Sequence, residues 1–121
     1  MSAKISILLV EDDDAFRYAA SRHLRSEGYT VIDVAGSMDA LKVLDGGGID
    51  MMVVDIALPV KEPPGFALAR MVRYKHPEMP VLFVTGVLDI EKIEPGIEGD
   101  MILYKPIEMS ELSRKISELL A

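Results

Sequence analysis

The stretch ILLVEDDD, from Ile7 to Asp14, joins an apolar run to four consecutive acids. The apolar part is typical of a buried strand. Like charges this close repel one another, and burying them is costly unless a cation or hydrogen bonds compensate. A solvated loop with a helix cap explains part of the charge: we expect Asp14 to cap the following helix and Asp13 to be solvated. The other two acids, Glu11 and Asp12, indicate a cation site.

Composition limits the possible partners. The chain has 121 residues and a formal net charge of −7, which predicts one domain over residues 1–121 and argues against direct binding of nucleic acid. It has no cysteine, so disulfides and thiolate metal ligands are excluded. No apolar run approaches the roughly 18 residues of a membrane span. We expect a cytoplasmic protein without membrane insertion.

Short β-rich runs alternate with amphipathic segments along the whole chain. Alternation of this kind predicts an α/β fold in which helices cover both faces of a parallel sheet. The favoured topology is a three-layer, flavodoxin-like (βα)5 domain with strand order 2-1-3-4-5. Five strands are predicted, at about Ile5–Val10, Thr30–Ala35, Met51–Asp55, Val81–Thr85 and Met101–Tyr104.

The segments between the strands carry helix signals. Gly28 should end the first helix, and Ser37 should cap a short second helix that stops before the GGG turn. A third helix is predicted over Gly65–Lys75, and a last one places apolar residues on one face near the end of the chain. Between the fourth and fifth strands, Pro and Gly in the segment Ile90–Gly99 predict a short or irregular helix.

Polar residues follow the predicted strands where each strand ends. Glu11 and Asp12 follow the first strand, Asp55 ends the third, Thr85 ends the fourth and Lys105 follows the fifth. The carboxyl ends of parallel strands lie along one edge of the sheet, so we expect these five side chains to meet in one pocket. Loop acids without a shared role are the competing interpretation, and convergence at the topological switch point disfavours it.

The chemistry of such a pocket follows from its charges. Three carboxylates without imidazole or thiolate suit Mg²⁺, which prefers oxygen ligands and keeps positions open for phosphate oxygens. A carboxylate can also act as a nucleophile, and Asp55 is the candidate. Its attack on phosphorus requires cationic and hydrogen-bonding groups around the phosphoryl oxygens, for which Lys105 and Thr85 are placed.

Four motifs carry a resemblance to a known family: LLVEDD near the start, VVDIALP around Asp55, VTG at Val84–Gly86 and YKPI at Tyr104–Ile107. Over essentially its whole length the chain resembles the response-regulator receiver domains of two-component signalling. The resemblance implies that Asp55 takes a phosphoryl group from a histidine kinase or a phosphotransfer protein. It implies a chain that is an enzyme only in the limited sense of promoting its own phosphorylation and dephosphorylation.

The resemblance also assigns roles within the pocket. Glu11 and Asp12 would bind Mg²⁺ with Asp55 and the backbone carbonyl of Ala57. Thr85 and Lys105 would contact the phosphoryl group, and the Lys105–Pro106 peptide bond would be cis, which costs little before proline.

Two features depart from the family pattern. Gly65 comes ten residues after Asp55 rather than about eight, so KEPP (61–64) resembles a small insertion. The family's switch aromatic, three residues before the lysine, is replaced by Ile102, which is apolar and stiff. Because side chains alternate along a strand, Tyr104 should share the face of Ile102, and we hypothesise that it stands in as the switch. A static surface tyrosine is the alternative.

Other interpretations remain open. His23 and His76 are expected to be structural or solvated rather than phosphorylated. The domain could act alone or be part of a longer hybrid kinase or transcription factor. A flavodoxin-like module for a small ligand is a third possibility, disfavoured because acids occupy the place of a phosphate-binding loop.

Overall fold

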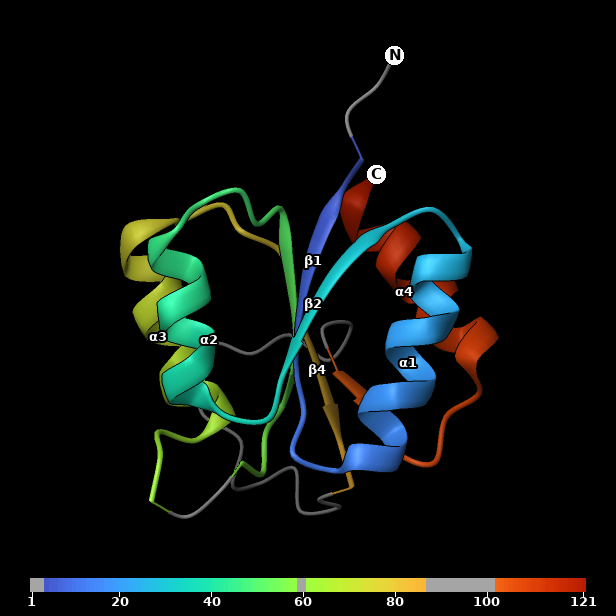
Figure 1. The fold of residues 1–121 in the computed structure, drawn as a ribbon, viewed down its shortest axis with the longest axis horizontal. Helices are drawn as coiled ribbons and strands as arrows, with labels where there is room; N and C mark the ends of the chain where they lie inside the picture. Colours follow the sequence, from blue (N-terminus) through green and yellow to red (C-terminus); the bar gives the residue numbers. More distant parts are fainter. Residues whose placement is uncertain (1–3, 59–60, 87–101) are drawn as a thin grey trace.

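A computed structural model describes residues 4–58, 61–86 and 102–121 of the chain. Five parallel strands form one sheet in the order β2-β1-β3-β4-β5. Helices α1 and α4 cover one face of this sheet, and α2 and α3 cover the other (Figure 1). The expected three-layer α/β fold and strand order are confirmed.

The observed elements lie close to the predicted ones. The strands are β1 Ser6–Val10, β2 Thr30–Val34, β3 Met51–Asp55, β4 Val81–Thr85 and β5 Ile102–Tyr104. The helices are α1 Asp14–Ser26, α2 Ser37–Asp45, α3 Gly65–Lys75 and α4 Met109–Leu120. The helix expected within Ile90–Gly99 lies outside the described residues. None of the helices in the described ranges is both long and apolar enough to cross a membrane.

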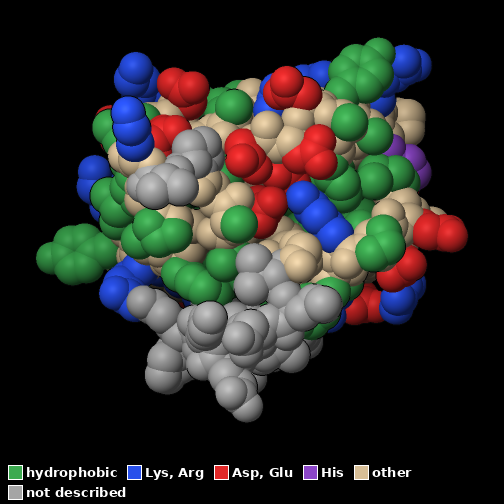
Figure 2. All heavy atoms as spheres, turned by 90° about the horizontal axis from the view of Figure 1, so that it is seen from below, with side chains coloured by type: hydrophobic (Ala, Val, Ile, Leu, Met, Phe, Trp, Pro, Cys, Tyr) green, Lys and Arg blue, Asp and Glu red, His purple; other side chains and the backbone are tan. Residues whose placement is uncertain are grey.

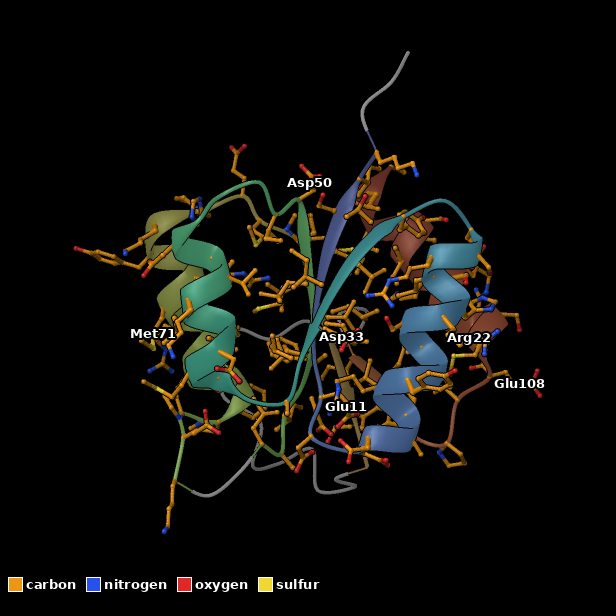
Figure 3. All side chains as sticks on the ribbon, viewed as in Figure 1. Glu11, Arg22, Asp33, Asp50, Met71 and Glu108 are labelled. Atoms are coloured by element: carbon orange, nitrogen blue, oxygen red, sulfur yellow. The ribbon has the colours of Figure 1, made fainter. Side chains whose placement is uncertain are left out.

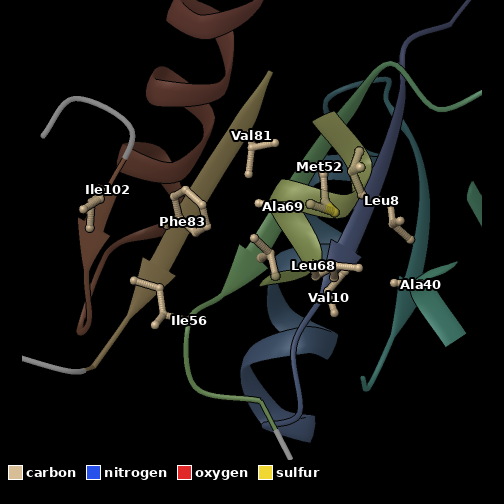
Figure 4. Packing of buried hydrophobic residues seen from close by; sticks show 12 residues of the cluster. Leu8, Val10, Ala40, Met52, Ile56, Leu68, Ala69, Val81, Phe83 and Ile102 are labelled. Atoms are coloured by element: carbon tan, nitrogen blue, oxygen red, sulfur yellow. The ribbon is translucent and has the colours of Figure 1, made fainter. Parts of the chain in front are cut away.

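Strand alternation divides the core into two clusters. Leu8 and Val10 point to the α2/α3 face, where they pack with the residues of Figure 4, whereas Ile7 and Leu9 point to the α1/α4 face. Burying each such side chain stabilises the fold by roughly 1.5–3 kcal/mol. Because β1 and β3 carry buried apolar side chains on both faces, the centre of the sheet offers no polar site. The polar side chains of these two strands lie at their ends.

The first helix begins one residue earlier than expected. Asp13, not Asp14, is the N-cap, and its carboxylate accepts hydrogen bonds from the N–H groups of Ala15 at 3.0 Å and Phe16 at 3.3 Å. The prediction that Asp14 caps the helix is therefore wrong, whereas Asp13 is exposed as expected and supplies the cap itself. The cause is local: the Glu11 carboxylate accepts from the Asp13 N–H at 3.2 Å, which fixes the turn and leaves Asp13 extended at the helix start.

The second helix corrects another capping prediction. Gly36 is the N-cap, and no side chain of the cap residue bonds to the helix. Ser37 instead lies fully buried in the first turn and donates its hydroxyl hydrogen bond to the carbonyl of Pro63. A side chain on Gly36 would overlap the carboxylate of Glu62, and that carboxylate accepts from the Met38 N–H at 2.9 Å. The KEPP segment thus supplies the cap from a distant part of the chain.

Candidate functional site

Two buried carboxylates lie side by side at the carboxyl edge of the sheet. Val10 of β1 is paired with Val54 of β3, so the next residues, Glu11 and Asp55, emerge on neighbouring strands. Their exposed fractions are 1% and 6%. Figure 3 shows Glu11 at this end of β1, and Figure 2, which looks onto that edge, shows acidic side chains gathered beside a basic one.

A third carboxylate completes an acidic cluster. Asp12 is exposed in the loop after β1, and one oxygen from each of Glu11, Asp12 and Asp55 lies within 4.8 Å of the others. Among the described residues, these three side chains have oxygens close enough to one another to hold a single metal ion. The expectation that the acids after β1 face Asp55 is confirmed by this geometry.

Lys105 joins the cluster from the strand end two positions away. Its Nζ donates to Asp55 Oδ2 at 3.1 Å and, at shorter range, to Glu11 Oε1. The backbone N–H of Lys105 donates to the carbonyl of Thr85 at 2.8 Å, which fixes the start of the β5–α4 loop against β4. The Lys105–Pro106 peptide bond is cis, as the resemblance implied.

The pKa values in the cluster follow from burial and charge. Burial raises the pKa of Glu11 from 4.5 to about 7; the hydrogen bond from Lys105 opposes this rise, and the neighbouring Asp55 adds to it. Burial lowers the pKa of Lys105, but its hydrogen bonds to Glu11 and Asp55 outweigh that effect, so the net pKa is raised. The ammonium therefore stays charged and partly neutralises the two acids.

The donor set fits a hard divalent cation. Three carboxylates and one ammonium leave excess negative charge when the acids are ionised, and the cluster offers oxygen ligands without nitrogen or sulfur. The Ala57 N–H donates to Asp55 Oδ1 at 2.9 Å, which orients the Asp55 carboxylate within the cluster. Mg²⁺ matches these oxygens, and the role of the Ala57 carbonyl as a further ligand stays a prediction.

Thr85 and Tyr104 lie on the other face of the sheet. Thr85 is fully buried at the end of β4 and is paired with Tyr104 of β5. Ile102 belongs to the α2/α3-face core, and half-buried Tyr104 packs against the same cluster. Ile102 and Tyr104 therefore share a face, as predicted, whereas contact of Thr85 with a phosphoryl group and movement of Tyr104 remain predictions.

One residue near the cluster was missed by sequence reasoning. Arg17 on α1 donates to the carbonyl of Glu11 at 2.8 Å and to Asp14 at 2.6 Å, which ties the acidic loop to the helix. A basic residue one turn after an acidic run was the available signal.

The histidines have structural surroundings. His23 Nε2 lies 2.6 Å from Ser113 Oγ and 2.8 Å from Glu27 Oε1, which links α1 to α4. His76 is exposed and ends α3. Both positions agree with the prediction of structural or solvated roles.

A parallel sheet of this order, with three acids and a lysine at its carboxyl edge, defines a receiver-type domain. The family model described as the response regulator receiver domain matches residues 7–117. The chain belongs to this family.

Curated relatives place the domain in longer proteins. The chain is 33% identical to the sensor kinase CckA of Brucella abortus over 99% of its own length and 13% of that protein. It is 32% identical to the transcriptional regulatory protein RprY of Bacteroides fragilis, again over 99% of this chain and 51% of the relative. The chain thus spans about half or less of these relatives.

Solved structures agree with the fold. A response regulator receiver protein from Sinorhizobium medicae has a TM-score of 0.86 at 30% identity, covering 97% of this chain and 94% of that one. The receiver domain of the hybrid histidine kinase CckA has a TM-score of 0.79 at 32% identity, covering 96% of this chain and 99% of the other.

Proposed function

We propose that this receiver accepts a phosphoryl group on Asp55 and changes its contacts with partner proteins as a result. The observation that carries the proposal is the geometry around Asp55: oxygens of Glu11 and Asp12 lie within 4.8 Å, and Lys105 Nζ donates to Asp55 Oδ2 at 3.1 Å. A lone buried aspartate would be a poor acceptor, whereas one flanked by cationic groups can bring phosphoryl oxygens close.

The transfer is a displacement at phosphorus. A carboxylate oxygen of Asp55 forms a new bond to phosphorus while the bond between phosphorus and the donor's imidazole nitrogen breaks, and that nitrogen keeps the electron pair and takes up a proton. Lys105 moves from the Asp55 carboxylate toward a phosphoryl oxygen, and Thr85 donates its hydroxyl to another. Water later attacks the phosphorus of the acyl phosphate, the bond between phosphorus and the Asp55 oxygen breaks, and inorganic phosphate leaves as the Asp55 carboxylate is regenerated.

Mg²⁺ held by Glu11, Asp12, Asp55 and the Ala57 carbonyl would neutralise the charge of the incoming phosphoryl group. The protein's own part is to keep two buried acids ready for that ion. In the metal-free protein Lys105 holds these two acids together, because its ammonium donates hydrogen bonds to both Glu11 and Asp55.

The donor class is a histidine kinase or a histidine phosphotransfer protein. Similarity to the receiver of a hybrid histidine kinase and to the sensor kinase CckA supports this class. We propose that the domain acts in the cytoplasm as a stand-alone receiver; a full-length gene that encodes a longer kinase or transcription factor would overturn the stand-alone form.

The output proposal concerns Tyr104. It shares the face of Ile102 and is half-buried against the α2/α3-face core, so its ring lies at the border between packed and exposed surroundings. NMR spectra of the free protein and of the protein with beryllofluoride and Mg²⁺ would show a change of rotamer. A ring that keeps one rotamer in both states would leave Tyr104 a static aromatic.

The direct test of the proposed function is intact mass after incubation with acetyl phosphate, with and without Mg²⁺. We expect a gain of one phosphoryl group that requires Mg²⁺ and is abolished in Asp55→Asn. Asp45→Asn is the matched control, because Asp45 is an exposed carboxylate at the end of α2. An undiminished gain in Asp55→Asn would refute the assignment of the acceptor.

A further inference from the structure

The Lys105 ammonium has an aromatic neighbour as well as two carboxylates. Its Nζ lies 4.5 Å from the centre of the Phe16 ring, while it donates to Glu11 and Asp55. A cation over a ring face at this distance is attracted by the quadrupole of the ring. The lysine side chain is only 20% exposed, so this attraction is less screened than on an open surface.

Phe16 is held in place by α1 itself. It lies in the first turn, where its N–H donates to the Asp13 cap at 3.3 Å, and its side chain packs against the α1/α4-face core. The ring therefore has a fixed position relative to the loop that carries Glu11. A hollow of about 320 Å³ beside the ring is lined by Phe16, Lys105, Pro106 and Ile107.

A ring differs from a carboxylate as a partner for the ammonium. It attracts the ammonium through the quadrupole of the ring, so the attraction does not depend on whether Nζ bonds to a carboxylate or to a phosphoryl oxygen.

We propose that Phe16 is a positioning residue for Lys105: its ring face keeps the ammonium beside Asp55 while the lysine transfers from carboxylate to phosphoryl oxygens. The inference rests on the proposed function, because it assigns Lys105 to the phosphoryl group. It adds a residue of α1 to the machinery at the carboxyl edge of the sheet.

The test compares variants that differ in the ring. Phe16→Leu keeps an apolar side chain but lacks a π-face, and we expect phosphorylation by acetyl phosphate to slow about three- to tenfold, as expected for loss of a partly desolvated cation–π contact. Phe16→Tyr retains the face and should restore most of the rate. Tyr18→Leu is the matched control, since Tyr18 is a 64% exposed aromatic of the same helix, over Arg22, and should leave the rate unchanged.

Two further measurements separate positioning from packing. In a Lys105→Gln background, Phe16→Leu should cause no additional slowing, because the ring would have no ammonium to hold. In the unphosphorylated protein, NMR should show the Lys105 Hε protons shifted upfield by the ring current in wild type and Phe16→Tyr, and unshifted in Phe16→Leu.

The outcomes are distinguishable from failure of the proposed function. If wild type is not phosphorylated, the proposed function fails, and the Lys105 Hε shift still reports on the ring contact. Equal rates in Phe16→Leu and wild type, slowing in Phe16→Tyr as large as in Phe16→Leu, or the same slowing in the Lys105→Gln background would each overturn the role of Phe16.

Discussion

The two faces of the sheet end differently at its carboxyl edge. On the α1/α4 face the apolar column of each central strand runs into charge: Leu9 is followed by Glu11, and Val53 by Asp55. On the α2/α3 face β3 and β4 continue into uncharged residues: Val54 is followed by Ile56, and Phe83 by Thr85. Figure 1 shows the helix pair that covers each face.

The difference shows how strand alternation separates two tasks. One face places the acids and Lys105 together beside α1, whereas the other packs the connection after Asp55 against α2 and α3. If this division is right, changes on the first face should alter charge-dependent behaviour, and changes on the second should alter stability without removing metal binding.

The largest expected effect tests the charged face through pH. The pKa of Glu11 is raised in the folded protein from 4.5 to about 7, chiefly by burial, so the folded state binds more protons than the unfolded state between these values. In metal-free protein this stabilisation should be complete below pH 4.5 and be lost as pH rises to about 7. Its size is on the order of a few kcal/mol, since one pKa unit corresponds to roughly 1.4 kcal/mol.

Glu11→Gln should remove that dependence, because the amide keeps the shape of the side chain without titrating. Urea unfolding from pH 4 to 8 in EDTA would measure it. Parallel stability curves for Glu11→Gln and wild type would contradict the raised pKa of Glu11.

The next largest effect is expected at Gly65, the first residue of α3, whose N–H donates to the Ile56 carbonyl at 3.1 Å. A Cβ there would overlap the Asp55 carbonyl and lie 2.9 Å from Ile56 Cα. We expect Gly65→Ala to lose about 1–3 kcal/mol of stability, as for other overpacked sites, and to slow phosphorylation of Asp55. The Mg²⁺-dependent rise in melting temperature should persist.

Gly46→Ala is the control for Gly65→Ala. Its nearest neighbour would be 3.4 Å away and its φ of −75° suits alanine, so stability should be unchanged or raised. Equal stabilities for Gly65→Ala and wild type would show that α3 can shift freely away from Asp55.

A smaller effect is expected from Mg²⁺ binding at the cluster of Glu11, Asp12 and Asp55. Mg²⁺ at ten times its dissociation constant should stabilise the protein by about 1.4 kcal/mol if it binds only the folded state. Asp12→Ala should lose most of this response, and Asp45→Ala, which removes an exposed acid elsewhere, should keep it. Thermal melts over a millimolar Mg²⁺ series would measure both. An equal response of Asp12→Ala and wild type would exclude Asp12 as a ligand.

The smallest effect tests the uncharged face alone. Glu62→Ala removes the carboxylate that accepts from the Met38 N–H, and loss of such a cap costs typically about 1 kcal/mol. Glu62→Gln keeps an acceptor and should lose less. Lys61→Ala, an exposed neighbour in the same segment, is the control for chemical denaturation. If Glu62→Ala changed the rise in melting temperature that Mg²⁺ causes, the α2/α3 face would affect metal binding, contrary to the proposed division.

Sequence patterns predicted the sheet and the gathering of Glu11, Asp12, Asp55 and Lys105 because both follow from short-range periodicity and one topological rule. Each strand is a local apolar run, and its last residue is fixed at the sheet edge. The site required no knowledge of side-chain packing beyond strand order.

Sequence patterns failed where several neighbouring residues could fill one role, or where a residue's partner is distant in the chain. In EDDD each of the three aspartates is a competent cap, and the hydrogen bond from the Asp13 N–H to Glu11 favours Asp13 as the cap of α1. Ser37 is a residue type that often caps helices, but its hydroxyl donates to the Pro63 carbonyl. The Glu62 carboxylate instead accepts a hydrogen bond from the Met38 N–H in the first turn of α2. The contact of Phe16 with Lys105 likewise joins residues far apart in sequence. Local propensity cannot rank such tertiary partners.

The placement of Glu11 and Asp55 at the ends of β1 and β3 has a consequence for hydrogen–deuterium exchange. Both strands are hydrogen-bonded to neighbours on two sides, and the Glu11 N–H itself donates to the Val34 carbonyl at 3.0 Å. Amides in such positions exchange with solvent chiefly when the whole domain opens, whereas helix ends and loops exchange through smaller openings. The two buried acids therefore keep their spacing through local fraying, and the acceptor geometry disappears only with global unfolding.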